Sequence, residues 1–168
     1  ATPIVPEAAP ATSAAPAASA SELAAAPRIT ISTPSLEGTI SLLGGRIDDL
    51  SLVKYRETLD PGSPSVRLLA PVGGTDLNAP KPYYAVYGWT PAGGLDPALV
   101  PNARTLWSAA PGASLAPGKP VTLTWNNGAG LIFNREIAVD PDYLFTITQS
   151  VQNTTANAVR LAPYGIVA

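Results

Sequence analysis

The feature that most restricts the fold of this chain is a succession of short apolar runs that begins at Arg28. The runs are rich in Ile, Val, Leu, Thr, Tyr and Trp and are separated by Gly, Pro, Asn and Asp. Runs of this kind are typical of β-strands, and no segment sustains the apolar repeat of a helix. The expected strands cover residues 29–32, 36–43, 47–52, 65–70, 83–89, 104–109, 121–125, 130–139, 143–152 and 159–167. The sequence therefore predicts an all-β fold, an antiparallel β-sandwich over residues 28–168.

The last third of the chain carries the clearest strand pattern. Residues 121–125 alternate apolar side chains with Thr, and Asn126-Asn127-Gly128 then tolerates positive φ and predicts a hairpin. Asp140-Pro141-Asp142 predicts a second turn, and residues 153–157 predict a third. We expect an antiparallel meander of four strands here. The last strand stays apolar to its end, so we also expect that the natural chain continues, that the sandwich is incomplete at the C-terminus and that this strand leaves an exposed edge.

Residues 1–27 have a different composition. They contain twelve Ala and five Pro, and only Glu7 and Glu22 are charged. Such a segment buries too little side chain to offset its ordering entropy, which predicts a flexible tether. The prolines favour an extended chain, although residues 21–26 permit one helical turn. The segment lacks the basic start and compact apolar core of an intact signal peptide.

The absent residue types exclude several functions. The chain has no histidine, cysteine or methionine. It therefore lacks the commonest general base, the thiol nucleophile and the soft metal ligands, which argues against catalytic triads, zinc sites and haem ligation. The net charge is −2 and the lysines and arginines do not cluster, so we expect no nucleic-acid binding. No apolar run is long enough to span a bilayer, so we expect membrane attachment through segments outside this chain.

The carboxylates are the remaining candidates for chemistry. Asp140 and Asp142 flank a proline, and a calcium loop would need several more oxygen ligands, so we interpret them as a turn. The apolar phase slips at Asp48-Asp49, which predicts a β-bulge. With Glu57 these aspartates suggest an acid/base pair for glycosides, but adjacent residues of a strand face opposite sides, which argues against that reading.

The aromatic side chains suggest either a core or a binding platform. Three Trp and six Tyr are spread over the expected strands, and strand aromatics more often fill a core than bind sugars or peptides. Tyr83 and Tyr84 are the exception, because neighbours on a strand face opposite sides and one of the two is expected to be exposed. We therefore regard Tyr83 and Tyr84 as the candidate partner or ligand surface.

The glycine pairs and two serines carry no catalytic signal. The pairs at 44–45, 73–74 and 93–94 lack the spacing and the lysine of a phosphate-binding loop and predict turns. Ser108 and Ser114 have no histidine to activate them. We expect no enzyme activity and no catalytic, cofactor-binding or metal-binding residues.

Several motifs occur in the order that one protein family shows. The run GTISLLGGRIDDLSLVKYRET at 38–58 resembles the start of the large periplasmic domain of the YidC family of bacterial membrane-protein insertases. Further matches follow in order: VRLL at 66–69, PYYA at 82–85 with Gly88-Trp89, TLW at 105–107, LTWNNG at 123–128 and LAPYG at 161–165. The resemblance covers residues 28–168 and is that of an alphaproteobacterial member. The Ala/Pro-rich lead resembles the variable tether that follows the first transmembrane helix in this family.

The resemblance implies a β-supersandwich of galactose-mutarotase-like architecture, in the periplasm, in an inner-membrane protein. Sugar epimerases of that architecture depend on histidine, which is absent here, so their activity is not implied. What is implied is support of membrane-protein insertion and folding, with contact to SecDF, the SecYEG translocon and membrane-protein clients, and with no cofactor. The family's insertase residues lie in the transmembrane bundle, so none is carried over to this chain.

Two alternatives remain open. One is a secreted carbohydrate-binding or carbohydrate-modifying β-sandwich. Sugar binding that is lost on Tyr83→Ala or Tyr84→Ala would support it. The other is a periplasmic peptide chaperone that adds a client strand to an open sheet edge.

Overall fold

The computed structural model describes residues 18–72 and 82–168 and is built almost entirely of strands. One short α-helix and one 3-10 helix complete it: α1 (Ala20–Ala25) and η1 (Pro97–Leu99). The strands are β1 (Arg28–Ser32), β2 (Leu36–Ser41), β3 (Arg46–Arg56), β4 (Ser65–Leu69), β5 (Ala85–Ala92), β6 (Ser114–Leu115), β7 (Val121–Asn126), β8 (Leu131–Val139), β9 (Phe145–Asn153) and β10 (Arg160–Val167). The predicted all-β class is confirmed.

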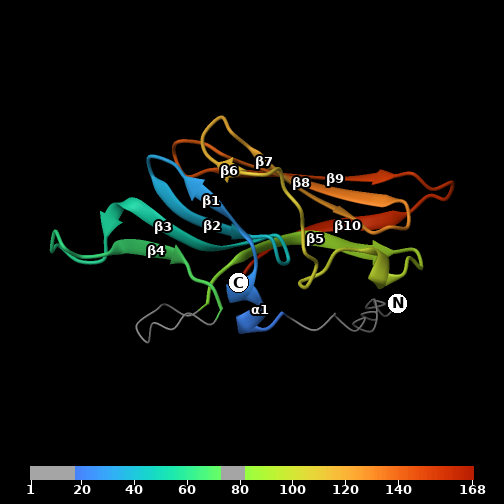
Figure 1. Cartoon of the computed structure of the whole chain (residues 1–168), viewed down its shortest axis with the longest axis horizontal. Coiled ribbons are helices and arrows are strands. Elements are labelled where there is room, and N and C mark those ends of the chain that lie inside the picture. The colour runs from blue at the N-terminus through green and yellow to red at the C-terminus, as the bar shows by residue number, and fades with distance from the viewer. Residues whose placement is uncertain (1–17, 73–81) are drawn as a thin grey trace, which may run out of the picture.

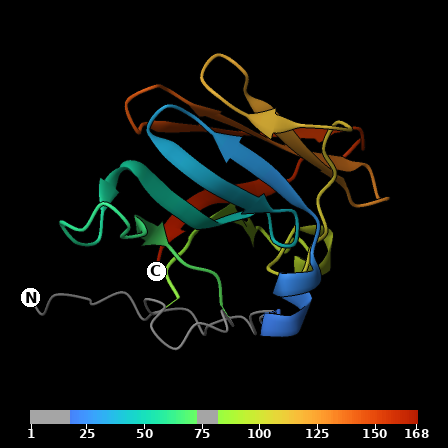
Figure 2. The ribbon, with the colours of Figure 1, turned by 60° about the vertical axis from the view of Figure 1, so that its left-hand side comes forward.

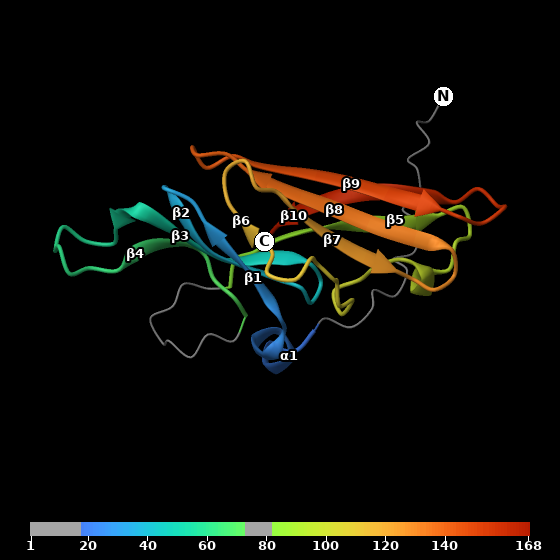
Figure 3. The same ribbon diagram turned by 45° about the horizontal axis from the view of Figure 1, so that its top comes forward.

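The strands form two sheets that face each other (Figures 1 and 3). The larger sheet has the order β10-β5-β3-β2-β1-β6, with β4 also paired to β3, and the smaller has the order β7-β8-β9. All pairs are antiparallel except β1 with β6. The inward-facing apolar side chains of both sheets make one continuous core, as a sandwich requires. The predicted sandwich is therefore confirmed.

The bulge predicted at the aspartate pair is present between β2 and β3. Thr39 pairs with Asp49 and the next residue, Ile40, pairs with Ile47, which leaves Asp48 without a partner in the ladder. The extra residue returns Ile47 and Leu50 to the core face, where both side chains are buried.

The expected four-stranded meander is wrong in its last strand. β7, β8 and β9 are consecutive hairpin partners, but β10 pairs with β5 in the larger sheet. Two cross-strand pairs explain why β10 packs against β5: Tyr164 lies opposite Gly88, and Gly165 lies opposite Tyr87. Each tyrosine ring covers the space where a Cβ on the facing glycine would stand. Turn residues in the sequence do not distinguish a hairpin from a connection that crosses between sheets.

The expected strand at 104–109 is also wrong, although its alternation is right. Thr105 and Trp107 are buried while Leu106 is exposed. The backbone of Leu106, however, forms an isolated β-bridge with Leu43, and the backbone of Ser108 forms one with Thr124 of β7. The segment passes from one sheet to the other, so it cannot continue as a strand of either.

Helix α1 lies on the face of the larger sheet that points away from β7–β9 (Figure 2). Ser19 and Glu22 form a capping box at its start, and Leu23 is buried to 2% exposure. Glu22 also pairs with Arg104. The backbone and hydroxyl hydrogen bonds from Ser19, together with Arg104, lower the pKa of Glu22. The sequence permitted one helical turn in this region, and α1 is that turn. The division into a 1–27 tether and a 28–168 domain stays a prediction.

Replacing Leu23 with alanine is expected to release α1 from the domain. Burial of a leucine side chain contributes about 2 kcal/mol, so amide exchange in α1 should accelerate by about tenfold or more. Hydrogen exchange read by mass spectrometry measures this. Ala24→Ser, on the exposed side of the same helix, is the control and should leave exchange nearly unchanged. Equal protection in the two variants would contradict a docking role for Leu23.

Candidate functional site

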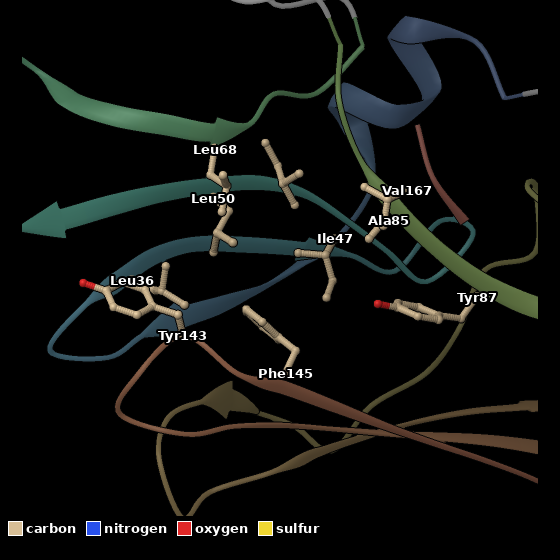
Figure 4. Close-up of a pocket in the computed structure, with 10 residues that line it drawn as sticks. Leu36, Ile47, Leu50, Leu68, Ala85, Tyr87, Tyr143, Phe145 and Val167 are labelled. Atoms are coloured by element: carbon tan, nitrogen blue, oxygen red, sulfur yellow. The ribbon is translucent and has the colours of Figure 1, made fainter. Parts of the chain in front are cut away.

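An apolar cleft of about 180 Å³ lies between the two sheets. Figure 4 shows its two walls: β2, β3, β4, β5 and β10 supply one, and the start of β9 supplies the other. The lining residues are Leu36, Ile47, Leu50, Leu68, Leu69, Ala85, Tyr87, Tyr143, Phe145 and Val167. Leu68, Tyr143 and Val167 are exposed to solvent at 47%, 37% and 60%. The cleft therefore opens outward and offers apolar surface to a ligand.

A hydrogen bond joins the two sheets next to Leu36, which lines this cleft. The fully buried hydroxyl of Ser35, in the β1–β2 turn, donates to the carbonyl oxygen of Pro141, in the β8–β9 turn, at 2.9 Å. Two residues later, Tyr143 has φ of +86°, a left-handed conformation that side chains rarely adopt. Such strain persists only where the surroundings hold it. Here it directs the Tyr143 ring to the cleft.

A buried arginine contacts the backbone of Tyr87, another residue that lines the cleft. Arg135, on β8, is 1% exposed, and its guanidinium lies 4.6 Å from the Trp107 ring and 5.8 Å from the Trp89 ring. It donates to the carbonyl oxygen of Gly45 at 2.7 Å and to that of Tyr87. Desolvation lowers the pKa of Arg135 to about 10, opposed by the nearby phenols of Tyr164 and Tyr87. The side chain is therefore charged at neutral pH.

Sequence reasoning did not single out Arg135 or Ser35. A signal for Arg135 was present, because it occupies an inward position of β8, in phase with Leu131, Phe133, Ile137 and Val139. A charged residue in an otherwise apolar phase indicates a buried polar contact. No comparable signal marks Ser35, whose burial depends on the packing of two turns.

The three tryptophans belong to the core. Trp89 and Trp107 are buried, with ring centroids 6.3 Å apart, and Phe133 lies 5.1 Å from Trp89. Trp125 is partly buried against Phe133, at 5.6 Å. Trp89 and Trp107 are therefore not available to stack on a sugar.

Tyr83 and Tyr84 occupy different surroundings. Tyr83 is 46% exposed, and its backbone forms an isolated β-bridge with Ala70. The ring of Tyr84 lies under the guanidinium of Arg46 at 4.6 Å, and its backbone pairs with Ala168. Tyr84 is thus committed to internal contacts, while Tyr83 has a free surface. Their assignment as a partner surface stays a prediction.

Asp48 and Asp49 do not face opposite sides as expected. Arg28 pairs with Asp48 and also donates to the Thr39 hydroxyl, which in turn donates to Asp49 at 3.0 Å. The bulge therefore brings both carboxylates into one network, and Asp49 pairs in addition with Arg67 at 2.7 Å. Each aspartate has an arginine partner, so the network is one of ion pairs.

The other sequence candidates are turn and loop residues. Oδ1 of Asp140 accepts from the backbone N–H of Asp142 and of Leu144, which confirms the turn. Glu57 is exposed beyond the end of β3. The pairs Gly44-Gly45 and Gly93-Gly94 have positive φ and form turns, while the pair at 73–74 lies outside the described residues.

The two serines hold local hydrogen bonds. Ser108 donates to the carbonyl oxygen of Thr124, and Ser114 accepts from Lys119. Among residues 18–72 and 82–168, no three acidic side chains gather closely enough to hold a metal ion. What this arrangement offers chemically is apolar contact in the cleft and backbone pairing at a sheet edge.

Comparison with known proteins decides the family. The model of the YidC periplasmic domain matches residues 28–168. The chain belongs to the YidC periplasmic domain family. It is 57% identical over 167 residues, 99% of the chain, to the membrane protein insertase YidC of Dinoroseobacter shibae. It is 54% identical over 156 residues, 84% of the chain, to that of Paracoccus denitrificans, and 58% identical over 133 residues, 79% of the chain, to that of a Ruegeria species.

The match to the YidC family confirms the resemblance found in the motifs and the periplasmic location expected for this domain. The chain spans about a quarter of the length of these relatives, at 26%, 25% and 21%. In the part that the structure describes, no helix has the length and apolar character needed to cross a bilayer.

Proposed function

We propose that this chain is the periplasmic part of a YidC-type membrane protein insertase that supports the insertion and folding of inner-membrane proteins. The observation that carries the proposal is the family match over residues 28–168, together with relatives that are named as insertases. The domain acts by docking with the Sec machinery, SecDF and SecYEG, and not by catalysis. A sequence without histidine or cysteine supports a non-catalytic role.

Co-purification of the full-length insertase with SecDF tests the docking role. Deletion of residues 28–168 is expected to reduce the recovery of SecDF by about tenfold, because the docking surface is lost. A control replaces residues 1–17 with a Gly/Ser linker of equal length and should recover SecDF as the unchanged protein does. Equal recovery after the deletion would remove docking from this domain.

A peptide chaperone is the second candidate, and the position of β10 favours it. β10 is the last strand of the larger sheet in the described residues. Tyr84 and Ala168 exchange both backbone hydrogen bonds, so by alternation Pro163, Gly165 and Val167 direct their backbone groups to the free edge. Pro163 has no N–H, so only the part near Gly165 and Val167 can pair with an added strand.

Hydrogen exchange along β10, with and without an unfolded client, distinguishes this candidate. New protection of the Gly165 and Val167 amides supports strand addition. Unchanged exchange there removes it. A secreted carbohydrate-binding role is not favoured, because Trp89 and Trp107 are buried in the core and the family is that of a membrane protein insertase.

A further inference from the structure

Arg135 carries a charge in the core without a carboxylate partner among the residues that the structure describes. Carbonyl oxygens of Gly45 and Tyr87 and the faces of two tryptophans surround its guanidinium instead. Removing a charge from water costs free energy, and an apolar side chain of similar volume is often no less stable at such a position. The contacts of Arg135 therefore indicate a role beyond filling the core.

The contacts of Arg135 join the two sheets. The residue belongs to β8 in the smaller sheet, whereas Gly45 precedes β3 and Tyr87 lies on β5, both in the larger sheet. Its ladder partner on β9, Gln149, accepts from Nε of Arg135 at 3.4 Å and donates to the carbonyl oxygen of Gly88 at 3.4 Å. Two neighbouring side chains of the smaller sheet thus hold two successive carbonyl groups of β5.

The apolar cleft adjoins both this pair and the Ser35–Pro141 hydrogen bond, since Tyr87 and Leu36 line it. Tyr87, whose carbonyl oxygen Arg135 holds, places its ring in one wall. Phe145, on the same strand as Gln149, supplies the other wall. Burial raises the pKa of the Tyr87 phenol, in agreement with a ring enclosed between the sheets. The Arg135 and Gln149 hydrogen bonds therefore set the separation of β5 from the smaller sheet, while the Ser35–Pro141 hydrogen bond holds the β1–β2 turn against the β8–β9 turn.

We infer that Arg135, with Gln149, is an inter-sheet latch that holds the apolar cleft at its observed width. Releasing the latch lets β5 move away from β9 at Tyr87 and widens the cleft toward Phe145. The Ser35–Pro141 contact then acts as the remaining hinge point. Arg135 is a positioning residue in this scheme, since it does not line the cleft itself.

Binding of the neutral apolar dye N-phenyl-1-naphthylamine to the 168-residue chain tests the latch. Arg135→Met keeps an unbranched apolar side chain but removes all donors, and it is expected to tighten dye binding about tenfold. Gln149→Leu, which leaves Arg135 in place, is expected to tighten it about threefold. Arg160→Met, at an exposed arginine on β10, is the matched control and should bind as the unchanged chain does.

A filling substitution separates the latch from general loosening of the core. Ala85 is buried and lines the cleft, so Ala85→Leu should occupy the widened space. Adding Ala85→Leu to Arg135→Met or to Gln149→Leu is expected to return dye binding to the level of the unchanged chain. Tighter binding that survives Ala85→Leu would overturn the inference, as would unchanged binding in Gln149→Leu. If Arg135→Met does not fold, dye binding by Gln149→Leu with and without Ala85→Leu decides the question.

Discussion

Replacing Phe133 with alanine is expected to lower the free energy of unfolding by about 3–5 kcal/mol. Phe133 is fully buried on β8, the central strand of the smaller sheet. Its ring meets Trp89 edge-on at 5.1 Å and Trp125 at 5.6 Å, so it links the tryptophans of both sheets. Alanine would remove these contacts and leave a cavity that stiff neighbouring rings cannot refill. Urea unfolding followed by tryptophan fluorescence measures the change.

The matched control for core truncation is Leu59→Ala. Leu59 is 104% exposed at the tip of the β3–β4 hairpin, which projects from the body of the sandwich at the left of Figure 1. Its truncation should change the free energy of unfolding by less than about 0.5 kcal/mol. A loss at Phe133 as small as that at Leu59 would show that the core between the sheets contributes little to stability.

Gly38→Ala is expected to lower the free energy of unfolding by about 3 kcal/mol, because the β3 backbone next to the bulge at Asp48 lies directly against Gly38, the partner of Leu50. A Cβ on Gly38 would stand 2.1 Å from the backbone oxygen of Asp49 and 2.9 Å from Cα of Leu50. Both atoms belong to the backbone of β3, so no side chain can rotate to make room. The alanine variant must move the bulge and, with it, the buried Ile47. Chemical denaturation and the exchange rates of β2 and β3 amides report the effect.

Gly62→Ala separates this steric effect from the general cost of replacing a glycine. Gly62 lies in the turn between β3 and β4, and the nearest atom to its Cβ position is Oδ1 of Asp60 at 3.5 Å. Its φ is not positive, so alanine should change stability by no more than about 0.5 kcal/mol. If the two substitutions cost the same, the close approach at Gly38 is not what limits the bulge.

Much of this architecture follows from local pattern. The alternation in β7, β8 and β9 places Leu123, Phe133 and Ile147 on one face, and the slip at Asp48 forecasts the bulge. These features could be predicted because the side-chain direction in a strand repeats every two residues, so a shift of one residue moves the side chains to the other face. The same reasoning placed the tryptophans in the core.

The candidate site could be predicted only in part. One of Tyr83 and Tyr84 was expected to be exposed because they are neighbours on a strand, and the structure shows that it is Tyr83. The cleft, by contrast, draws Leu36, Leu68, Tyr87, Phe145 and Val167 from five strands that are far apart in the sequence. No periodicity within one strand reports which residues of another strand will face it, so the cleft was not foreseen.

By itself, the sequence determined the class of the fold, the strand phases and the family, and it excluded histidine and cysteine chemistry. Those properties depend on residue type and on short-range repetition, which the chain carries in every segment. Only the tertiary structure decided that β10 leaves β9 to pair with β5, that the Arg135 guanidinium meets Gly45 and Tyr87, and that a cleft lies between the sheets. Each of these depends on how two sheets are stacked, because side chains distant in sequence meet only when long-range packing is settled.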